Sequence, residues 1–157
     1  MLTPKTVDDS RAQRVEILMP SHINGYNRLF GGKLMEWIDV VAGVAARRHS
    51  GHEVTTATVD HLEFQAPAYV NSTISLEGRL TYVGRTSMEV RVDTYVEELN
   101  GARSRVNRAY LVMVALDENH KPTPVPPLRL LTDEDRREWE AGERRQALRK
   151  QRKMEQY

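Results

Sequence analysis

Asp39 is the residue of this chain whose surroundings most strongly suggest chemistry. It lies in an apolar stretch from Leu34 to Ala46, in which the only other charged residue is Glu36. Burying an unpaired carboxylate is costly, so Asp39 must pair with a cation, accept hydrogen bonds or face a solvated cleft. A general base in a cleft has such an environment. A structural acid that is hydrogen-bonded to a neighbouring strand also has it, and the residues alone leave both roles open.

A glycine pair, Gly31 and Gly32, stands at the start of the same stretch. Without β-carbons there, a ligand can approach backbone N–H groups that have no intrahelical partner and that carry the positive end of the helix dipole. Such donors could polarise a carbonyl group or hold an oxyanion. Alternatively, the pair forms a turn that lets the helix pack closely. Asn24 is close enough in sequence to share this corner, where its uncharged amide could orient a water molecule or a carbonyl group.

Several other kinds of site find no support in the sequence. The absence of cysteine excludes disulfide scaffolds, thiolate zinc sites and cysteine nucleophiles. A GxSxG elbow, a P-loop and a GxGxxG motif are also missing. His49 and His52 have no third ligand at a suitable spacing, so we expect a solvated helix end there and no metal site. Asn71 begins a glycosylation sequon, which we interpret as a strand entry because no secretory signal accompanies it.

Charge and hydropathy narrow the possible partners and the location. Lys and Arg number 23 and Asp and Glu 22, so the formal net charge of +1 offers no overall attraction for nucleic acid. No apolar run approaches the roughly 18 residues of a membrane span, and the first residues lack the basic and apolar regions of a secretory signal. We therefore expect a cytoplasmic protein with neither a membrane nor a nucleic acid as partner, and no metal or redox cofactor.

The elements that would position the candidate residues are one helix and an antiparallel sheet. The helix is predicted from Gly31 to Arg48, and it is apolar nearly all round, so it should be buried. The stretch from Thr86 to Glu97 alternates between an apolar and a largely charged face, as a strand does. Tight connections are predicted at Gly84-Arg85 and Asn100-Gly101. The other strands are predicted over Val54 to Leu62, Thr73 to Val83 and Ser104 to Leu116. This order indicates an α+β fold in which the sheet wraps around the helix.

The end of the chain differs in composition from the rest. Lys121 to Pro127 contains four prolines and is predicted to be a stiff, extended connector. From Thr132 to Tyr157 there are 8 basic and 7 acidic residues, with the acids early and the bases late, which suits a helix that begins after an N-cap at Thr132. We interpret it as a solvated helix that frays at its end, with a basic partner-binding arm as the alternative.

Taken together, these motifs resemble the hot-dog-fold acyl-CoA thioesterases of the cytosolic acyl-CoA hydrolase family. The resemblance covers roughly Met19 to Leu128, and the charged tail is similar too. The matching segments are Asn24, Phe30-Gly31-Gly32, Leu34-Met35, Ile38 to Gly43, Val54 to Asp60, Phe64 to Pro67, Tyr82 to Val90, Val114 to Asp117 and Pro124 to Leu128.

The resemblance implies a fold, an assembly and a set of roles. It implies an N-terminal extension with the first strand over residues 1–18, a hot-dog domain over 19–131 and a charged C-terminal helix over 132–157. Two subunits would pair into a double hot-dog, with active sites at the dimer interface, and three dimers would form a hexamer. Asp39 would activate water or attack the thioester, with Asn24 as its polar partner. The turn Gly84-Arg85-Thr86-Ser87 would contact the phosphates of CoA, although it could equally be an ordinary hairpin turn.

A distance argument favours a shared site independently of the resemblance. Gly32 and Asp39 are seven residues apart, so at ~1.5 Å of rise per residue they stand about 10 Å apart along the helix. One helix therefore cannot present both to one carbonyl group, whereas a two-fold axis could bring Asp39 of a second subunit to this corner. Two alternatives remain. One is a hydratase or dehydratase, which the lack of a histidine within the predicted helix disfavours; the other is a non-catalytic acyl-CoA-binding protein.

Overall fold

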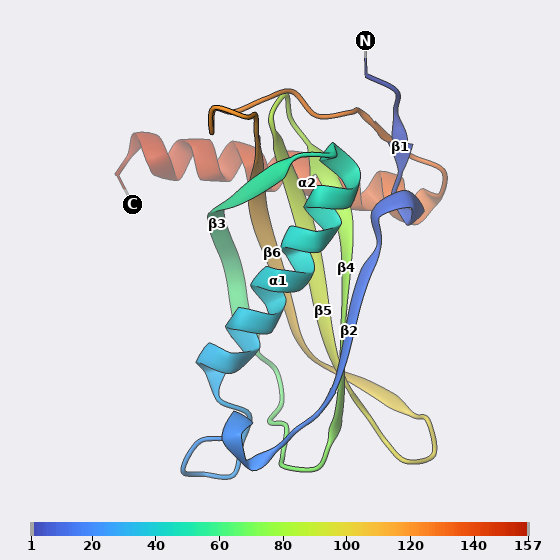
Figure 1. The fold of residues 1–157 in the computed structure, drawn as a ribbon, viewed down its shortest axis with the longest axis vertical. Coiled ribbons are helices and arrows are strands. Elements are labelled where there is room, and N and C mark those ends of the chain that lie inside the picture. Colours follow the sequence, from blue (N-terminus) through green and yellow to red (C-terminus); the bar gives the residue numbers. More distant parts are fainter. Residues whose placement is uncertain (1, 157) are drawn as a thin grey trace.

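A long helix, α1 (Gly31–Ser50), lies across one face of a five-stranded antiparallel sheet in the computed structural model, which describes residues 2–156 (Figure 1). The strands are arranged in the order β2-β4-β5-β6-β3, so β2 and β3 form the two edges. Their bounds are β2 (Ala12–Ile17), β3 (Glu53–Phe64), β4 (Thr73–Val83), β5 (Ser87–Glu97) and β6 (Arg103–Leu116). The predicted α+β architecture, with a helix wrapped by an antiparallel sheet, is confirmed, and β4, β5 and β6 are neighbours in chain order whereas β3 pairs with β6.

The remaining elements are short, apart from one helix at the end of the chain. Strand β1 (Lys5–Thr6) pairs in parallel with β7 (Leu128–Arg129), which brings the two ends of the sheet domain together. Two 3₁₀ turns, η1 (Asp8–Ser10) and η2 (Pro20–His22), flank β2, and the final helix is α2 (Asp133–Met154). No helix among residues 2–156 is both long enough and apolar enough to cross a membrane.

Helix α1 is buried on the side that faces the sheet and partly exposed on the other side. Leu34, Ile38 and Ala42 are completely buried, whereas Val40 is 48% exposed. The prediction of a helix buried on all sides is therefore wrong for the single chain, because the sheet covers only one side. The helix ends at Gly51, whose positive φ of 72° forms a left-handed cap that is strained for other residues.

His49 corrects a second prediction. We expected a solvated helix end, but α1 extends to Ser50 and the His49 side chain is completely buried. Its Nε2 atom lies 2.8 Å from the carbonyl oxygen of Pro126, in the predicted extended connector. Burial lowers the pKa of His49, and the hydrogen bond to Pro126 only partly opposes this effect. The connector folds back over the end of the helix, which is why the histidine is not solvated.

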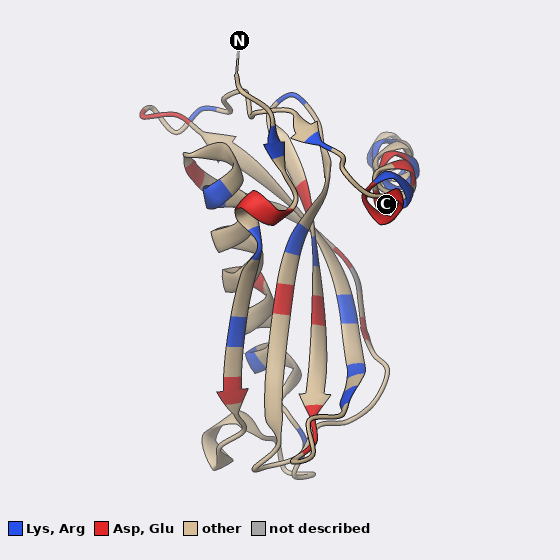
Figure 2. Ribbon diagram, turned by 90° about the vertical axis from the view of Figure 1, so that its right-hand side faces the viewer, with Lys and Arg blue, Asp and Glu red and all other residues tan. Residues whose placement is uncertain are grey.

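Helix α2 lies on the opposite face of the sheet from α1 (Figure 2). Its start is as predicted, because the Thr132 side chain accepts a hydrogen bond from the backbone N–H of Asp135 in a capping box. The interpretation as a solvated helix is wrong. Asp135 and Gly142 are buried, and the Trp139 ring packs against Tyr82 of β4 with centroids 4.4 Å apart.

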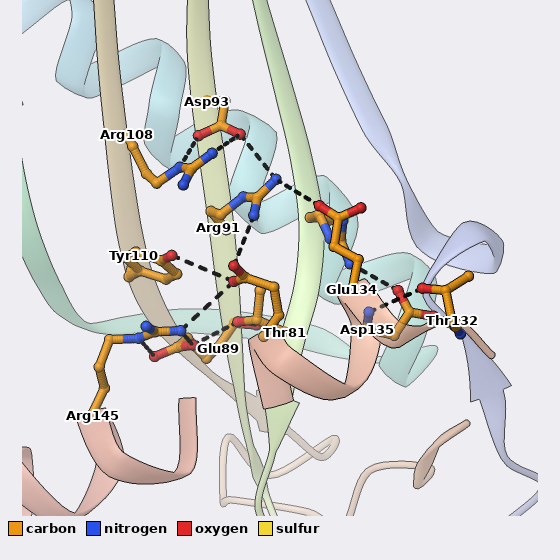
Figure 3. A network of polar contacts seen from close by, with 12 residues as sticks. Thr81, Glu89, Arg91, Asp93, Arg108, Tyr110, Thr132, Glu134, Asp135 and Arg145 are labelled. Carbon is orange, nitrogen blue, oxygen red and sulfur yellow. Dashed lines mark hydrogen bonds and ion pairs between the residues drawn. The ribbon is translucent and has the colours of Figure 1, made fainter. Parts of the chain in front are cut away.

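Ion pairs also join α2 to the sheet (Figure 3). Arg79 of β4 binds Asp135 at 2.8 Å, and Arg145 binds Glu89 of β5 through two contacts of 2.8 and 3.0 Å. Glu89, Arg91 and Asp93 form the charged face of β5, and all three are buried because α2 covers them or because they pair with neighbouring strands. The charged face that the sequence shows is therefore an interface between a helix and a sheet.

Candidate functional site

Asp39 lies on the side of α1 that faces the edge strand β3. The hydroxyl group of Thr56 on β3 donates a hydrogen bond of 2.6 Å to Oδ1 of Asp39. Asp39 is only partly buried, and no hydrogen bond occupies its second carboxylate oxygen within the described residues. Asp39 is thus bonded to a neighbouring strand, as the structural alternative requires, and still presents an oxygen that could accept a proton.

Thr56 is a site residue that the sequence reasoning did not assign. Strand β3 contains three threonines close together, Thr55, Thr56 and Thr58. Strand alternation alone does not say which hydroxyl faces α1. Only Thr56 does so, and it also lies 3.4 Å from the sulfur of Met113 in the core. Thr56 can be identified once β3 and α1 are known to pack together, because its hydroxyl group then lies opposite the carboxylate of Asp39.

The N-terminus of α1 has free donors, as the glycine pair predicts. Phe30, the N-cap residue, provides no side-chain hydrogen bond to the helix. The N–H groups of Lys33 and Leu34 bond to the Phe30 carbonyl group at 3.0 and 3.1 Å, which leaves those of Gly31 and Gly32 at the helix start. A β-carbon on Gly32 would lie 2.7 Å from the half-exposed ring of Phe30, which would have to move to admit it.

Asn24 lies at the same corner and holds its loop in shape. Its side-chain oxygen accepts hydrogen bonds from the backbone N–H groups of Tyr26, at 2.9 Å, and Arg28, at 3.3 Å. The side-chain oxygen of Asn24 therefore already accepts hydrogen bonds within the loop, and the NH₂ group is the part of the amide that can bind a ligand. Asn24 and Gly31 line one cavity of about 370 Å³. The other lining residues are Arg28, Leu29, Leu34, Phe64, Gln65, Ala66, Pro67, Ala68 and Val106.

The structure separates the predicted residues into three places within one chain. Asp39 is eight residues from Gly31, or about 12 Å along α1, and does not line the cavity. The turn from Gly84 to Ser87 follows the far end of β4, whose length of 11 residues corresponds to ~33 Å. Figure 1 shows the start of α1 and the turn between β4 and β5 at opposite ends of the sheet. Asn24 and Gly31 come together, whereas Asp39 pairs with Thr56 and the turn stays apart.

Among the side chains that the structure describes, no group of three or more His, Cys, Asp or Glu residues is arranged to hold a metal ion. Helix α1, which extends past its predicted end at Arg48, includes His49. It lies ten residues from Asp39, about 15 Å along α1, and its Nε2 atom is engaged by Pro126. His49 is therefore too far from Asp39 to form the histidine–acid pair that a hydratase would need.

A helix wrapped by an antiparallel sheet, with a carboxylate at mid-helix and free donors about 12 Å away at the helix N-terminus, is the arrangement that the resemblance to hot-dog thioesterases implies. The thioesterase superfamily matches residues 26–102 of the chain. The chain belongs to the acyl-CoA thioester hydrolases of this superfamily: it is 39% identical over 138 residues to a Bacillus subtilis protein described as an uncharacterized acyl-CoA thioester hydrolase, YkhA. This alignment covers 86% of this chain and 80% of that protein.

Solved structures agree with this assignment. A protein described as an apo-hexameric acyl-CoA thioesterase is 36% identical, with a TM-score of 0.92 over 96% of this chain and 97% of that chain. An acyl-CoA hydrolase of Staphylococcus aureus, bound to coenzyme A as an asparagine-to-alanine variant, is 28% identical with a TM-score of 0.94, over 99% and 94% of the two chains.

The Staphylococcus aureus enzyme has also been solved as aspartate-to-alanine and threonine-to-alanine variants. In its sequence the altered asparagine, aspartate and threonine are separated by 15 and 17 positions. Asn24, Asp39 and Thr56 have the same two separations here. The three residues altered in that enzyme therefore match Asn24, Asp39 and Thr56 in residue type and in spacing.

Proposed function

We propose that this protein hydrolyses acyl-CoA thioesters to a free fatty acid and CoA at a site that contains Asp39. The observation that carries this proposal is the hydrogen bond from Thr56 to Asp39, which fixes the carboxylate while one of its oxygens stays open. In the reaction, Asp39 takes a proton from a water molecule whose oxygen attacks the thioester carbon. The C–S bond then breaks, and the sulfur of CoA leaves as a thiolate that takes up a proton.

The carbonyl oxygen of the thioester needs donors as charge develops on it. We assign this role to the backbone N–H groups of Gly31 and Gly32, which carry the positive end of the α1 dipole. The NH₂ group of Asn24, at the same corner, orients the water molecule or the carbonyl group. The roughly 370 Å³ cavity beside them suits the acyl chain, because its walls are mostly apolar.

Two subunits are needed to complete this site. The distance of about 12 Å between Gly31 and Asp39 along α1 is too long for one carbonyl group to contact both. Within the described residues, β3 pairs only with β6, so its other edge is free to meet a second copy of the chain. Val40 on α1 and Phe64 at the end of β3 are about half exposed beside this edge. We assign Asn24, Gly31 and Gly32 to one subunit and Asp39 to its partner.

A further subunit would bring the turn from Gly84 to Ser87 to the CoA phosphates. This turn is too far from the cavity of its own chain, and Arg85 is exposed at its tip. Its guanidinium makes no ion pair with other residues in the described part of the chain. A hexamer of three dimers, as the solved hexameric neighbour suggests, provides such a subunit. A cytoplasmic location stays a prediction.

Mixing two inactive variants tests the shared site. Asn24→Ala and Asp39→Ala subunits should each be inactive alone. After equal mixing and subunit exchange, half of the dimers are hybrids and each hybrid has one intact site, so roughly a quarter of the wild-type activity should return. Native mass spectrometry with one of the two variants labelled with heavy nitrogen verifies the exchange, because the unlabelled chains have almost the same mass. If hybrids form and no activity returns, both residues belong to the same subunit or to no common site. A folded Asp39→Asn variant with normal turnover would contradict the catalytic assignment itself.

A further inference from the structure

Helix α2 holds the strand that carries Thr56. The Arg149 side chain, on the C-terminal half of α2, donates a hydrogen bond of 2.5 Å from Nε to Oδ2 of Asp60 on β3. Its Nη2 atom donates a hydrogen bond to Glu89 on β5, which also binds Arg145. Asp60, Glu89 and Arg149 are all nearly buried at these contacts. One arginine therefore connects the edge strand β3 to the middle of the sheet through α2.

A bulge in β3 separates Asp60 from Thr56. In a regular strand, residues four apart face the same side, so Thr56 and Asp60 would both face α1 or both face α2. Thr56 pairs with Met113 and Thr58 pairs with Val112, so two steps on β3 correspond to one step on β6. The extra residue turns the strand over at this point. As a result, Thr56 faces Asp39 on α1, while Asp60 faces Arg149 on α2.

Within the single chain, the ladder around this bulge is supported from one side only. β3 is an edge strand, and its register against β6 shifts a second time between Asp60 and Glu63. Only a short paired segment lies between the two irregularities. The contact with Arg149 therefore falls where backbone pairing alone defines the strand least well.

We propose that Asp60 and Arg149 are positioning residues for hydrolysis: they fix the bulge of β3 so that the Thr56 hydroxyl stays on Asp39. The inference rests on the proposed function, because it concerns hydrolysis at Asp39. It assigns no contact with substrate to either residue. It gives α2 a role in turnover, although the helix lies on the far side of the sheet from Asp39 (Figure 2). Loss of the Arg149–Asp60 contact should let Thr56 move away from the carboxylate.

The test compares turnover in variants that loosen this contact with variants that leave it intact. Asp60→Asn removes the charge without changing the volume, and Arg149→Gln removes the guanidinium. Each should lower kcat by roughly tenfold or more, because small displacements of catalytic groups cost that much, while KM changes less than about twofold. Arg144→Gln, at an exposed position on α2, should leave both parameters unchanged. Asp135→Asn weakens the other attachment of α2 to the sheet, at Arg79. It should lower the melting temperature of the protein but reduce kcat much less than Asp60→Asn does.

A double-mutant cycle separates positioning from a general loss of structure. In a Thr56→Val background the hydroxyl is already absent, so Asp60→Asn should cause no further decrease in kcat. An equal decrease in both backgrounds would overturn the inference, as would normal kcat in folded Asp60→Asn and Arg149→Gln variants. It would also fail if Asp135→Asn lowered kcat as strongly as Asp60→Asn. These outcomes differ from failure of the proposed function, for which Asp39→Asn would retain normal turnover.

Discussion

Replacing Thr56 by valine tests the contact on which the proposed site depends. Valine has nearly the same shape as threonine and suits a β-strand, but it cannot donate the 2.6 Å hydrogen bond to Asp39. Thr56 is exposed in the single chain, so the free energy of unfolding should change by less than about 0.5 kcal/mol. The effect should therefore appear in turnover and hardly at all in stability.

The expected loss of turnover follows from the kind of hydrogen bond that is removed. A hydrogen bond to a charged group contributes about 1.5 to 3 kcal/mol where water is excluded, as it is around a bound thioester, whereas water can replace the bond at the exposed Thr56 of the free chain. Each ~1.36 kcal/mol of transition-state stabilisation corresponds to a factor of ten in rate. If the hydroxyl holds Asp39 in its reactive orientation, kcat should fall by roughly 10- to 150-fold. KM should stay nearly constant because Thr56 does not line the cavity beside Asn24.

A thiol reagent that detects released CoA provides the assay, and the protein has no cysteine that would add to the signal. Thr55→Val, at the neighbouring exposed threonine, is the matched control and should retain full activity. Thr56→Ser keeps the hydroxyl and should retain most of it. If Thr56→Val retains kcat within about threefold, or if Thr55→Val loses as much, the hydrogen bond does not position the reactive carboxylate.

Two further predictions concern the attachment of α2. Burial alone would raise the pKa of Glu89, but hydrogen bonds from Arg145, Thr81 and Arg149 outweigh it and hold the pKa below the ordinary value of 4.5. Glu89 thus stabilises the fold above about pH 4.5, and this contribution is lost as the pH falls through its lower folded-state pKa. Glu89→Gln should cost about 3 kcal/mol or more at pH 7, and urea unfolding should show this difference shrinking in acid; a constant difference would contradict it. Gly142→Ala should lower the melting temperature, because the added β-carbon would lie 2.7 Å from Cβ of Tyr82 and 2.9 Å from Glu89. The helix propensity of alanine, which exceeds that of glycine by about 1 kcal/mol, acts in the opposite direction. A higher melting temperature would refute this close packing.

The parts of the fold that the sequence predicts well are those with a clear hydrophobic period. The helix from Gly31 and the alternating strand up to Glu97 lie within one to two residues of the predicted bounds. Asp39 and the glycine pair are candidates that the sequence can indicate, because a charge or a missing β-carbon stands out against apolar surroundings. Thr56 does not stand out in this way. A bulge determines which face of β3 carries the Thr56 side chain. One extra residue in a strand leaves no hydrophobic pattern in the sequence when the neighbouring residues are threonines.

The alternation of β5 indicates one apolar face, but it does not say what covers the other. A row such as Glu89, Arg91 and Asp93 looks the same in sequence whether water or a charged helix lies against it. His49 was misjudged for a related reason: nothing near it in the sequence shows that Pro126, 77 residues later, folds over the end of α1. Both errors concern contacts between distant segments, which local patterns do not encode.

The charged tail nevertheless carries a signal that becomes readable once the sheet is known. Arg145 and Arg149 are four residues apart, so they lie on one face of α2, and both contact Glu89. Buried ion pairs contribute little net stability compared with apolar packing, but removing one partner is costly, so such a set tolerates few alternative positions. A helix attached in this way is held in one position and register on the sheet. A fixed position of α2 would keep the bulge of β3, and with it the Thr56 hydroxyl, in place. This is the physical reason to expect turnover to depend on α2.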